Sequence, residues 1–495
     1  VVLYPARPQT WWVQDQPGFG FPVRYKVELA QKPDFSDAIL VVDKTQEDQP
    51  NPGENRVELP VDPPQKGRYL RLTAAQLAST AEGTYQLALA ELEVIDPSGA
   101  NVALRKPVQA TWSIEEGAIG AERLVDGVRR TTGKRRFSPM LRTEFELRGS
   151  VARARAYVSG LGYYELYING ARVGDHVLDP ANTVHAKRTL YSVYDVTELL
   201  RKQRGASIVA VGMMLGHGWH RDSCAAWLQL RIEYEDGRAE TVVTDESWRW
   251  SLGAIVEESL YHGEAYDARL EKGGRTWPYA PGWADSAYHD SDWQPAALYE
   301  SPPARMVAQV MPPIRVTERR RPVSITRLPE GSYIVDFGQN LTGWVRLDVE
   351  GPVGTKVTIR HAELLNPDGT LNPANLRSAR ATDVYILKGD GLETYRPHFT
   401  QHGFRYAEVI GYPGELTADR IEAEVFHTDY QQIGHFESTS PLLNNIRDIT
   451  LWSIRGNSMS IPTDCPQRDE RMGWMGDAHL AGEPTMLTFD TAAYY

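Results

Sequence analysis

Cysteine is scarce in this sequence: Cys224 and Cys465 are the only two among 495 residues. Two cysteines cannot build the framework of several disulfides that staples small secreted domains. The fold must therefore depend on buried apolar side chains, and hydrophobic residues make up 41% of the chain, which is enough for that. Because so few cysteines suit oxidising and reducing surroundings alike, a periplasmic, a secreted and a cytoplasmic location all stay open.

Long apolar runs and long basic runs are also missing. The longest apolar run, Ile208–Leu215, is much too short to span a bilayer, so we expect a soluble protein with no membrane span. No run of Lys and Arg exceeds three residues and the net charge is −12, which argues against nucleic acid as a partner. The chain begins at Val1 without a methionine, which is consistent with N-terminal processing.

What the sequence does contain is much alternation of polar and apolar residues, the pattern of half-buried strands. The segments with this pattern are 69–73, 85–94, 154–158, 208–211, 228–234, 333–337, 344–347, 357–360 and 406–410. Asn169-Gly170 lies inside a hairpin candidate, Tyr164–Val173, and favours a type I′ turn because both central residues tolerate φ > 0. Short strands separated by Gly/Pro turns predict β-sandwich domains.

The length of the chain predicts roughly three or four domains. Pro-rich stretches at Ser301–Pro303 and Met311–Pro313 mark a boundary. The pattern changes after about Gly434, where Ser440 provides an N-cap followed by a proline at the first helical position. Apolar residues then recur at helical spacing, which predicts a helix over Pro441–Arg455.

The most informative segment is Asp464–Asp477, which we call the acid loop. Pro466, Gly473 and Gly476 prevent it from forming one regular helix or strand. Carboxylates beside an aromatic face are what a site needs to hold a sugar and to protonate its glycosidic oxygen. The loop combines four carboxylates, two guanidinium groups and one indole: Asp464, Arg468, Asp469, Glu470, Arg471, Trp474 and Asp477.

Within the acid loop, Glu470 is the natural proton donor. Repulsion from Asp464, Asp469 and Asp477 would favour its protonated form, which a glycosidase acid needs near neutral pH.

Two other side chains of the acid loop suit sugar binding. Arg468 would hold the carboxylates together and could bind a sugar hydroxyl, while Trp474 could stack on the apolar face of a pyranose ring. At this level a surface turn whose charges satisfy each other is an equal alternative. A calcium loop fits less well, because the EF-hand pattern is missing. Serine hydrolases and zinc proteases are excluded by the absence of G-x-S-x-G and H-E-x-x-H.

The acid loop resembles the signature of bacterial α-L-rhamnosidases of glycoside hydrolase family 78. The resemblance extends upstream to three further segments: Tyr157–Gly170, Asp336–Trp344 and Phe399–Tyr406. It implies a multidomain, mainly β fold in which several β-sandwiches precede the first helices of an (α/α)6 barrel that is incomplete in this chain. The implied parts are a discoidin-like and possibly carbohydrate-binding β-sandwich at 1–100, a connecting segment at 101–139, two rhamnosidase β-sandwiches at 140–305 and 306–433, and the start of the barrel at 434–495.

The resemblance also implies a function, the release of terminal α-L-rhamnose from a glycoside or polysaccharide by an inverting exo-hydrolase that uses no metal and no cofactor. Glu470 would be the general acid, and the general base would lie downstream of this chain. The residues implied to contact the sugar are Asp464, Arg468, Asp469, Trp474 and Asp477. Three alternatives stay open: an exo-hydrolase for another α-L-sugar, a non-catalytic carbohydrate-binding β-sandwich protein, and an inactive fragment. The oligomeric state is not predicted.

Overall fold

The computed structural model describes residues 1–6, 18–53, 55–79, 85–111, 120–127, 137–202, 208–219, 224–271, 282–286, 288–300 and 304–495. The Pro-rich segment Ser301–Pro303 lies outside these residues. Contacts within the chain divide it into two compact units, Val1–Arg135 and Arg136–Tyr495, each with its own sheets.

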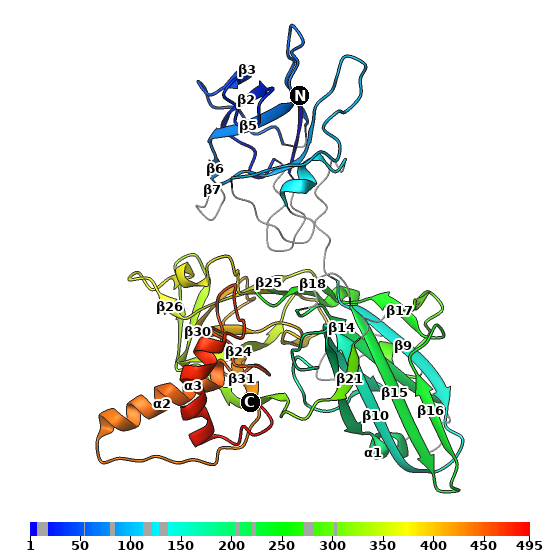
Figure 1. The fold of residues 1–495 in the computed structure, drawn as a ribbon. Helices are drawn as coiled ribbons and strands as arrows, with labels where there is room; N and C mark the ends of the chain where they lie inside the picture. The colour runs from blue at the N-terminus through cyan, green and yellow to red at the C-terminus, as the bar shows by residue number, and fades with distance from the viewer. Residues whose placement is uncertain are drawn as a thin grey trace. The chain divides into compact units, whose positions relative to one another are not determined.

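The first unit is built from short strands (Figure 1). Its elements are β1 (Val2–Pro5), β2 (Arg24–Ala30), β3 (Ile39–Lys44), β4 (Val57–Glu58), β5 (Tyr69–Gln76), β6 (Ala78–Ser79), β7 (Tyr85–Gln86), β8 (Leu89–Glu93) and the 3-10 helix η1 (Ala121–Val125). Two three-stranded antiparallel sheets have the orders β4-β1-β8 and β3-β2-β5. Leu3 and Leu92 of the first sheet pack with Tyr25 and Val27 of the second, so both sheets contribute to one core.

The predicted strand 85–94 is two strands in the structure. β7 ends at Gln86 and β8 begins at Leu89. Between them, the backbone N–H of Ala88 donates to the carbonyl of Gly20 at 2.9 Å, which takes this residue out of a strand ladder. The alternation of residues identified the strand character but not this local contact.

The second unit begins with two sheets that enclose a core (Figure 1). Their elements are β9 (Pro139–Glu146), β10 (Val151–Leu161), β11 (Tyr163–Ile168), β12 (Ala171–Arg172), β13 (Arg188–Asp195), β14 (Ile208–Gly216), β15 (Ala225–Tyr234), β16 (Ala239–Val243), β17 (Arg249–Leu252), β20 (Gln294–Pro295), β21 (Arg305–Ala308) and the short helix α1 (Thr197–Arg201). The sheet orders are β16-β15-β10-β13-β21 and β12-β11-β14-β9-β17-β20. Val158 and Leu230 of one sheet pack with Leu166 and Val211 of the other.

The predicted hairpin at Asn169-Gly170 is confirmed. β11 and β12 pair antiparallel on either side of it, and the φ angles of Asn169 and Gly170 are 46° and 76°, as a type I′ turn requires.

A ten-stranded sheet forms the next part of the second unit. Its elements are β18 (Ile255–Ser259), β19 (Gly263–Asp267), β22 (Ile314–Arg320), β23 (Ser324–Arg327), β24 (Tyr333–Glu350), β25 (Lys356–Ala362), β28 (Thr382–Ile386), β29 (Leu392–Tyr395), β30 (His402–Ile410) and β31 (Ile421–Thr428). The order is β18-β19-β28-β25-β30-β24-β31-β22, and β23 and β29 also pair with β24. Around the sheet lie β26 (Leu364–Leu365), β27 (Leu371–Asn372) and the 3-10 helices η2 (Ala268–Leu270), η3 (Gly282–Ala284) and η4 (Ala374–Leu376).

The two predicted strands 333–337 and 344–347 are one continuous strand, β24. Its register with β30 shifts between Asp336 and Leu341, and Gly338 has a φ of 75°. This bulge bends the strand without ending it, which explains why the apolar alternation is interrupted there.

The hairpin of β18 and β19 joins the ten-stranded sheet, although it precedes β20 and β21 in the sequence. β19 pairs in parallel with β28, with Ala265 opposite Val384. Strands from both sides of the Pro-rich region therefore share one sheet, and the hairpin ties it to the two-sheet part of the unit.

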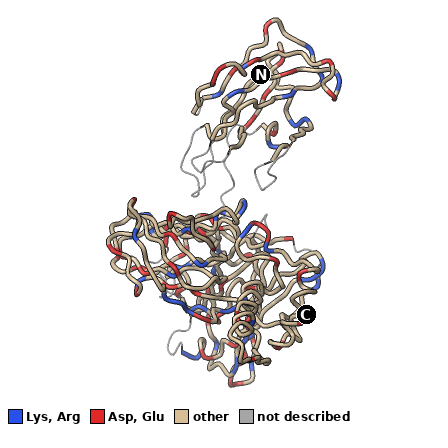
Figure 2. Tube along the Cα trace, turned by 90° about the vertical axis from the view of Figure 1, so that its left-hand side faces the viewer, with Lys and Arg blue, Asp and Glu red and all other residues tan. Residues whose placement is uncertain are grey.

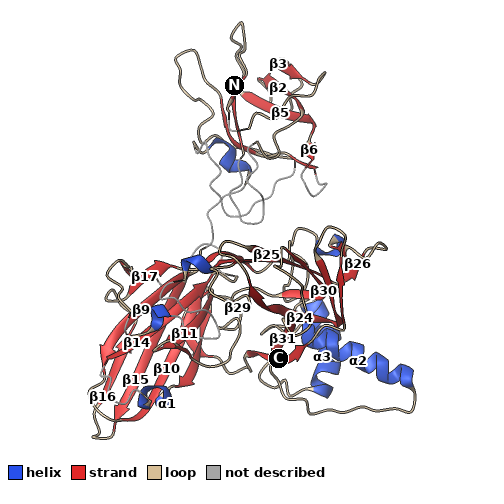
Figure 3. Cartoon of the chain, turned by 180° about the vertical axis from the view of Figure 1, so that it is seen from behind, coloured by secondary structure: helices blue, strands red, loops and turns tan. Residues whose placement is uncertain are grey.

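Two helices follow the sheet, α2 (Pro441–Gly456) and α3 (Met475–Thr488). The predicted helix over 441–455 is confirmed as α2, which begins after Ser440 and lies against β24 and β31 (Figure 3). α3 was not predicted, because Gly476, Gly482 and Pro484 disfavour a helix interior. Gly482 and Thr485 are its two buried positions, but a Cβ at Gly482 would meet no atom within 4 Å, so packing does not require a glycine there.

Charged residues are distributed over the surfaces of both units. Red and blue positions are interleaved along the tube, as expected of solvated surfaces (Figure 2). Among the described residues, no helix has the length and apolar character needed to cross a bilayer.

Both α2 and α3 carry apolar side chains on the surface of the second unit. The exposed apolar residues of α2 and α3 are Leu442, Leu443, Ile446, Ile449, Met475, Leu480, Met486 and Leu487.

Candidate active site

Glu470 lies on the connection between α2 and α3, where three donors face its carboxylate. Its Oε2 atom accepts from Nε of Arg468 at 3.0 Å and lies 3.3 Å from Nη1 of Arg377. Its Oε1 atom accepts from the indole Nε1 of Trp474 at 3.1 Å. The Glu470 side chain is 24% exposed. The carboxylate is thus held in one orientation and remains accessible to a ligand, as proton transfer to a bound substrate requires.

Arg468 also binds Asp464, since its Nη2 atom donates to Oδ2 of Asp464 at 2.9 Å. A carboxylate oxygen of Asp464 lies within 4.8 Å of one of Glu470, and the same guanidinium contacts both groups. Asp477 is exposed in the first turn of α3, where the helix N-terminus favours a negative charge. Asp464 thus lies near Glu470, and Arg468 holds the two carboxylates together, while the hydrogen-bond partners of Glu470 are guanidinium and indole groups.

Asp469 is bound to another part of the chain. Its Oδ1 atom accepts from Nε of Arg377 at 2.6 Å, and its Oδ2 atom accepts from the hydroxyl of Ser378. Burial raises the pKa of Asp469, but the hydrogen bonds from Ser378 and Arg377 outweigh burial and hold the pKa below its usual value. Sequence reasoning missed both donors, because they lie more than ninety residues upstream of Asp469 and no motif surrounds them.

Arg471 holds the acid loop in place from its buried side. The sequence did not indicate this role for Arg471. Its side chain is completely buried, and burial lowers its pKa to about 10. The hydroxyl of Tyr261 donates to the carbonyl of Glu470 at 2.9 Å and adds a second contact from the same side. The guanidinium of Arg471 donates to four backbone carbonyls: those of Leu260, Gln401, Gln467 and Arg468. A buried cation with carbonyl partners is a structural anchor, which composition alone could not distinguish from a sugar-binding arginine.

Asp464, Cys465 and Glu470 offer three possible metal-ligand atoms within 4.8 Å of one another. The guanidinium of Arg468 already contacts both carboxylates. Burial raises the pKa of the Cys465 thiol to about 11, which disfavours the thiolate that a metal needs. This geometry suits a carboxylate pair bridged by arginine better than a cation site.

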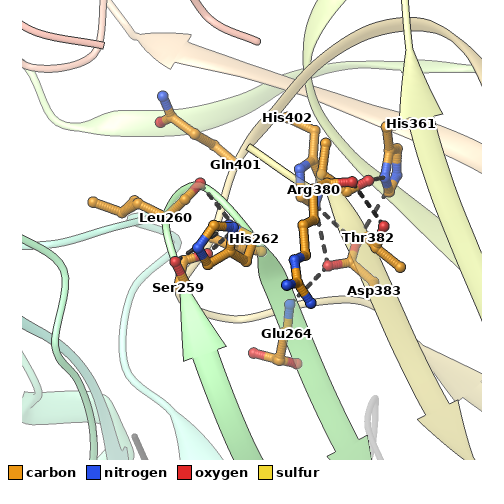
Figure 4. Close-up of polar contacts among 12 residues, drawn as sticks. Ser259, Leu260, His262, Glu264, His361, Arg380, Thr382, Asp383, Gln401 and His402 are labelled. Atoms are coloured by element: carbon orange, nitrogen blue, oxygen red, sulfur yellow. Dashed lines mark hydrogen bonds and ion pairs between the residues drawn. The ribbon is translucent and has the colours of Figure 1, made fainter. Parts of the chain in front are cut away.

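A second group of possible ligands, His361, Asp383 and His402, is completely buried in the ten-stranded sheet (Figure 4). Oδ2 of Asp383 lies 3.0 Å from Nε2 of His402 and 3.9 Å from Nε2 of His361. The two imidazole rings are stacked, with centroids 4.1 Å apart and planes 18° apart. Because ring lone pairs lie in the ring plane, those of stacked rings do not converge on one ion. We assign these residues to a buried hydrogen-bond network.

The pKa values of the groups in this network predict that the fold is less stable at acid pH. Burial lowers the pKa of His361 to about 3, lowers that of His402 as well, and raises that of Asp383 to about 6. At about pH 5 the unfolded chain binds a proton on each imidazole, whereas the folded chain binds one on Asp383. The unfolded state thus binds about one proton more, so stability should rise by about 1.4 kcal/mol per pH unit between about pH 4.5 and 6.

Denaturant unfolding at a series of pH values measures this slope, with His402→Gln as the comparison. The variant lacks one imidazole proton, so the proton counts of its two states become equal and the contribution of the network should vanish. An identical slope in wild type and variant would contradict the assignment.

Three family models match consecutive parts of the second unit. The α-L-rhamnosidase N-terminal domain matches residues 149–318, and the bacterial α-L-rhamnosidase concanavalin-like domain matches residues 326–427. The bacterial α-L-rhamnosidase 6 hairpin glycosidase domain matches residues 431–495, which include the acid loop.

Curated relatives are similar over most of the chain. An α-L-rhamnosidase of Streptomyces avermitilis is 42% identical over 364 residues, and one of Formosa agariphila is 35% identical over 377 residues. Each alignment covers 72% of this chain but only 35% and 38%, respectively, of the two relatives. The chain therefore spans little more than a third of their length.

Solved structures agree with these matches. The α-L-rhamnosidase from Dictyoglumus thermophilum has a TM-score of 0.69 and 34% identity, over 96% of this chain and 52% of that one. The Streptomyces avermitilis α-L-rhamnosidase complexed with L-rhamnose has a TM-score of 0.70 and 30% identity, over 97% of this chain and 48% of that one. By its consecutive domain matches and its fold, this chain belongs to the bacterial α-L-rhamnosidases of glycoside hydrolase family 78.

Proposed function

We propose that this chain supplies the general acid and part of the sugar site of an inverting exo-α-L-rhamnosidase, with Glu470 as the acid. The observation that carries the proposal is the partly exposed Glu470 carboxylate, oriented by Arg468 and Trp474 in a loop that a rhamnosidase family model matches. The chain spans about half of the solved relatives, so the activity of the whole protein is part of the proposal.

In this mechanism Glu470 gives its proton to the glycosidic oxygen as the bond to the anomeric carbon breaks. Arg468, which contacts Oε2, then stabilises the carboxylate that remains. Inversion requires a second carboxylate roughly 6.5–9.5 Å from the acid, with space for the attacking water between them. We place this base downstream of Tyr495.

The sugar would contact Arg468, Trp474 and Asp477, whereas Asp464 would act through Arg468, because its side chain is 4% exposed and its two oxygens accept from Arg468 and from the N–H of Met472. Trp474 is 51% exposed, and rhamnose has a methyl group where mannose has a hydroxymethyl group, so the indole ring suits the apolar side of rhamnose. Asp469 would act indirectly, because its two oxygens are bound by Arg377 and Ser378.

The helices α2 and α3 would be the first of the (α/α)6 barrel. Their exposed apolar side chains support this, because further barrel helices would cover them. The other proposed parts are a discoidin-like accessory domain at 1–100, a connecting segment at 101–139 and the two rhamnosidase β domains at 140–305 and 306–433.

Hydrolysis assays on the protein as its source makes it test this function. We expect release of L-rhamnose from nitrophenyl α-L-rhamnoside and much slower turnover of the matching α-L-fucoside and α-L-mannoside. NMR of the first product should show the β-anomer, as inversion requires. Turnover of another α-L-sugar in preference would change the substrate class. Rhamnose binding without turnover would replace the enzyme by a carbohydrate-binding protein.

Trp474 offers a test of the sugar contact. Trp474→Ala should raise KM for nitrophenyl α-L-rhamnoside about tenfold, because the variant loses the stacking surface. It should also lower kcat, because Oε1 of Glu470 loses its hydrogen-bond donor. In Trp474→Phe, which keeps a ring but not the N–H, KM should stay near the wild-type value while kcat falls. Unchanged steady-state parameters in the alanine variant would contradict this contact.

A further inference from the structure

The loop between β27 and β28, residues 373–381, reaches the acid loop from the ten-stranded sheet. We call it the bridging loop. It contains η4 followed by Arg377 and Ser378, and both of these residues bind Asp469. Asn375, within η4, donates to Glu363 at 2.6 Å and fastens the loop to its own domain. The bridging loop is therefore anchored at both sides.

Arg377 is the residue of the bridging loop that contacts both Asp469 and the proposed acid. Its Nε atom donates to Oδ1 of Asp469 at 2.6 Å, its Nη2 atom donates to the carbonyl of Asp469 at 3.4 Å, and its Nη1 atom lies 3.3 Å from Oε2 of Glu470. The planar guanidinium fork thus spans two consecutive residues of the acid loop, a geometry that lysine cannot reproduce.

The backbone of Arg377 is held in an unfavourable conformation, with φ 56° and ψ −116°. A residue with a Cβ rarely adopts such angles, and they persist only where the surroundings enforce them. The Arg377 side chain is 51% exposed, and an ion pair of this exposure adds little to stability. The small stabilisation from this ion pair therefore does not explain why the strained backbone of Arg377 persists. The placement of a functional group does explain it.

The charged groups around Glu470 are consistent with a functional placement of Arg377. Arg377 approaches Oε2 from the bridging loop and Arg468 approaches it from the acid loop, while Asp464 lies on the far side of Arg468. With Trp474 on Oε1, the carboxyl plane is fixed by donors from two directions. Removal of Arg377 would leave the Glu470 carboxylate with donors from its own loop, Arg468 and Trp474.

We propose that Arg377 is a positioning residue for the acid step: it orients Glu470 and stabilises the carboxylate that remains after the proton has left. This inference rests on the proposed function of Glu470. In the balanced step, water adds its oxygen to the anomeric carbon and gives a proton to the base. The bond to the leaving oxygen breaks, and that oxygen keeps the electron pair and takes the proton of Glu470. The new negative charge is then shared by the two carboxylate oxygens, of which Oε2 faces both arginines.

The kinetic test compares two leaving groups in the protein as its source makes it. An alkyl α-L-rhamnoside needs protonation of its leaving oxygen, whereas a dinitrophenyl α-L-rhamnoside hardly does. For Arg377→Ala we expect roughly a tenfold fall in kcat with the alkyl substrate and little change with the dinitrophenyl substrate. Arg377→Lys should recover part of the loss because it restores the charge but not the fork.

Arg405→Ala is the matched control. Arg405 is 40% exposed and also forms a two-atom ion pair, with Asp336 on β24. We expect both substrates to behave as with the wild type. Equal losses on both substrates in Arg377→Ala, or no loss on either, would overturn the positioning role.

A second measurement does not depend on turnover. Hydrogen exchange of peptides from the acid loop should be faster in Arg377→Ala than in wild type and in Arg405→Ala. Within Arg377→Ala, peptides from β24 and β30 should exchange at the wild-type rate. If the wild type fails to hydrolyse rhamnosides but this exchange rises, the proposed function is wrong and the placement of the acid loop by Arg377 stands. If turnover is present and exchange does not change, the inference is wrong and the function stands.

Discussion

Glu470→Gln is expected to lower kcat for an alkyl α-L-rhamnoside by about 10³-fold. An amide has nearly the shape of the carboxylic acid but has no acidic proton to give to the leaving oxygen. The loss should be much smaller with a dinitrophenyl α-L-rhamnoside, whose leaving group needs little protonation. Because the Glu470 side chain is partly exposed, the unfolding temperature should stay close to that of the wild type. Steady-state kinetics on the two substrates, with thermal unfolding of both proteins, measure these effects.

Glu350→Gln is the control for this variant. Glu350 is an exposed glutamate at the end of β24, and the same chemical change there should alter neither kcat nor stability. Near wild-type turnover of the alkyl substrate by Glu470→Gln would mean that another group is the acid. The resemblance of the acid loop to the family signature would then no longer support its assigned chemistry.

Arg471→Met is expected to destabilise the second unit by about 3 kcal/mol or more. The methionine fills part of the volume but leaves the buried carbonyl of Gln401 without its Arg471 donor, and leaves that of Leu260 with the Thr400 hydroxyl at 3.4 Å. Each unpaired buried carbonyl costs roughly 1–3 kcal/mol. Denaturant unfolding monitored by tryptophan fluorescence measures the change in the free energy of unfolding.

Arg231→Met provides the comparison. Arg231 is half exposed on β15 and pairs with Glu233, so its loss should cost less than about 0.5 kcal/mol. Arg471→Lys should fall between the two, because one ammonium cannot reach carbonyls that lie on three segments. Equal stability of Arg471→Met and wild type would show that the acid loop does not depend on this anchor.

The strands and the helix α2 were predictable because their signals are local. Alternation identified strand character within β5, β10, β14, β15, β24, β25 and β30, and Ser440-Pro441 fixed the start of α2 to the residue. α3 was missed because its small residues and Pro484 have a low helix propensity, and because Trp474 stands at the N-cap position, where no polar side chain marks the start of the helix.

The candidate site was predictable only as far as it lies in one segment. The acid loop collects Asp464, Arg468, Glu470 and Trp474 within a few residues, so composition alone drew attention to it. The contributions of Arg377 and Tyr261 come from loops that the sheet brings close to it. Such long-range contacts leave no periodic trace in the sequence, and the partners of a charged side chain cannot be inferred from its neighbours in the chain.

The parallel pairing of β19 with β28 has a consequence for synthesis on the ribosome. The N–H of Glu264 on β19 donates to Asp383 on β28, and the two residues are 119 positions apart in the chain. β19 is therefore synthesised long before β28. At typical elongation rates this interval lasts roughly ten seconds. During that time the hairpin of β18 and β19 presents an unpaired edge on a nascent chain whose two-sheet part can already be folded. We therefore expect this edge to be the region most in need of chaperone protection during translation, and the closing of the ten-stranded sheet to be a late and slow event.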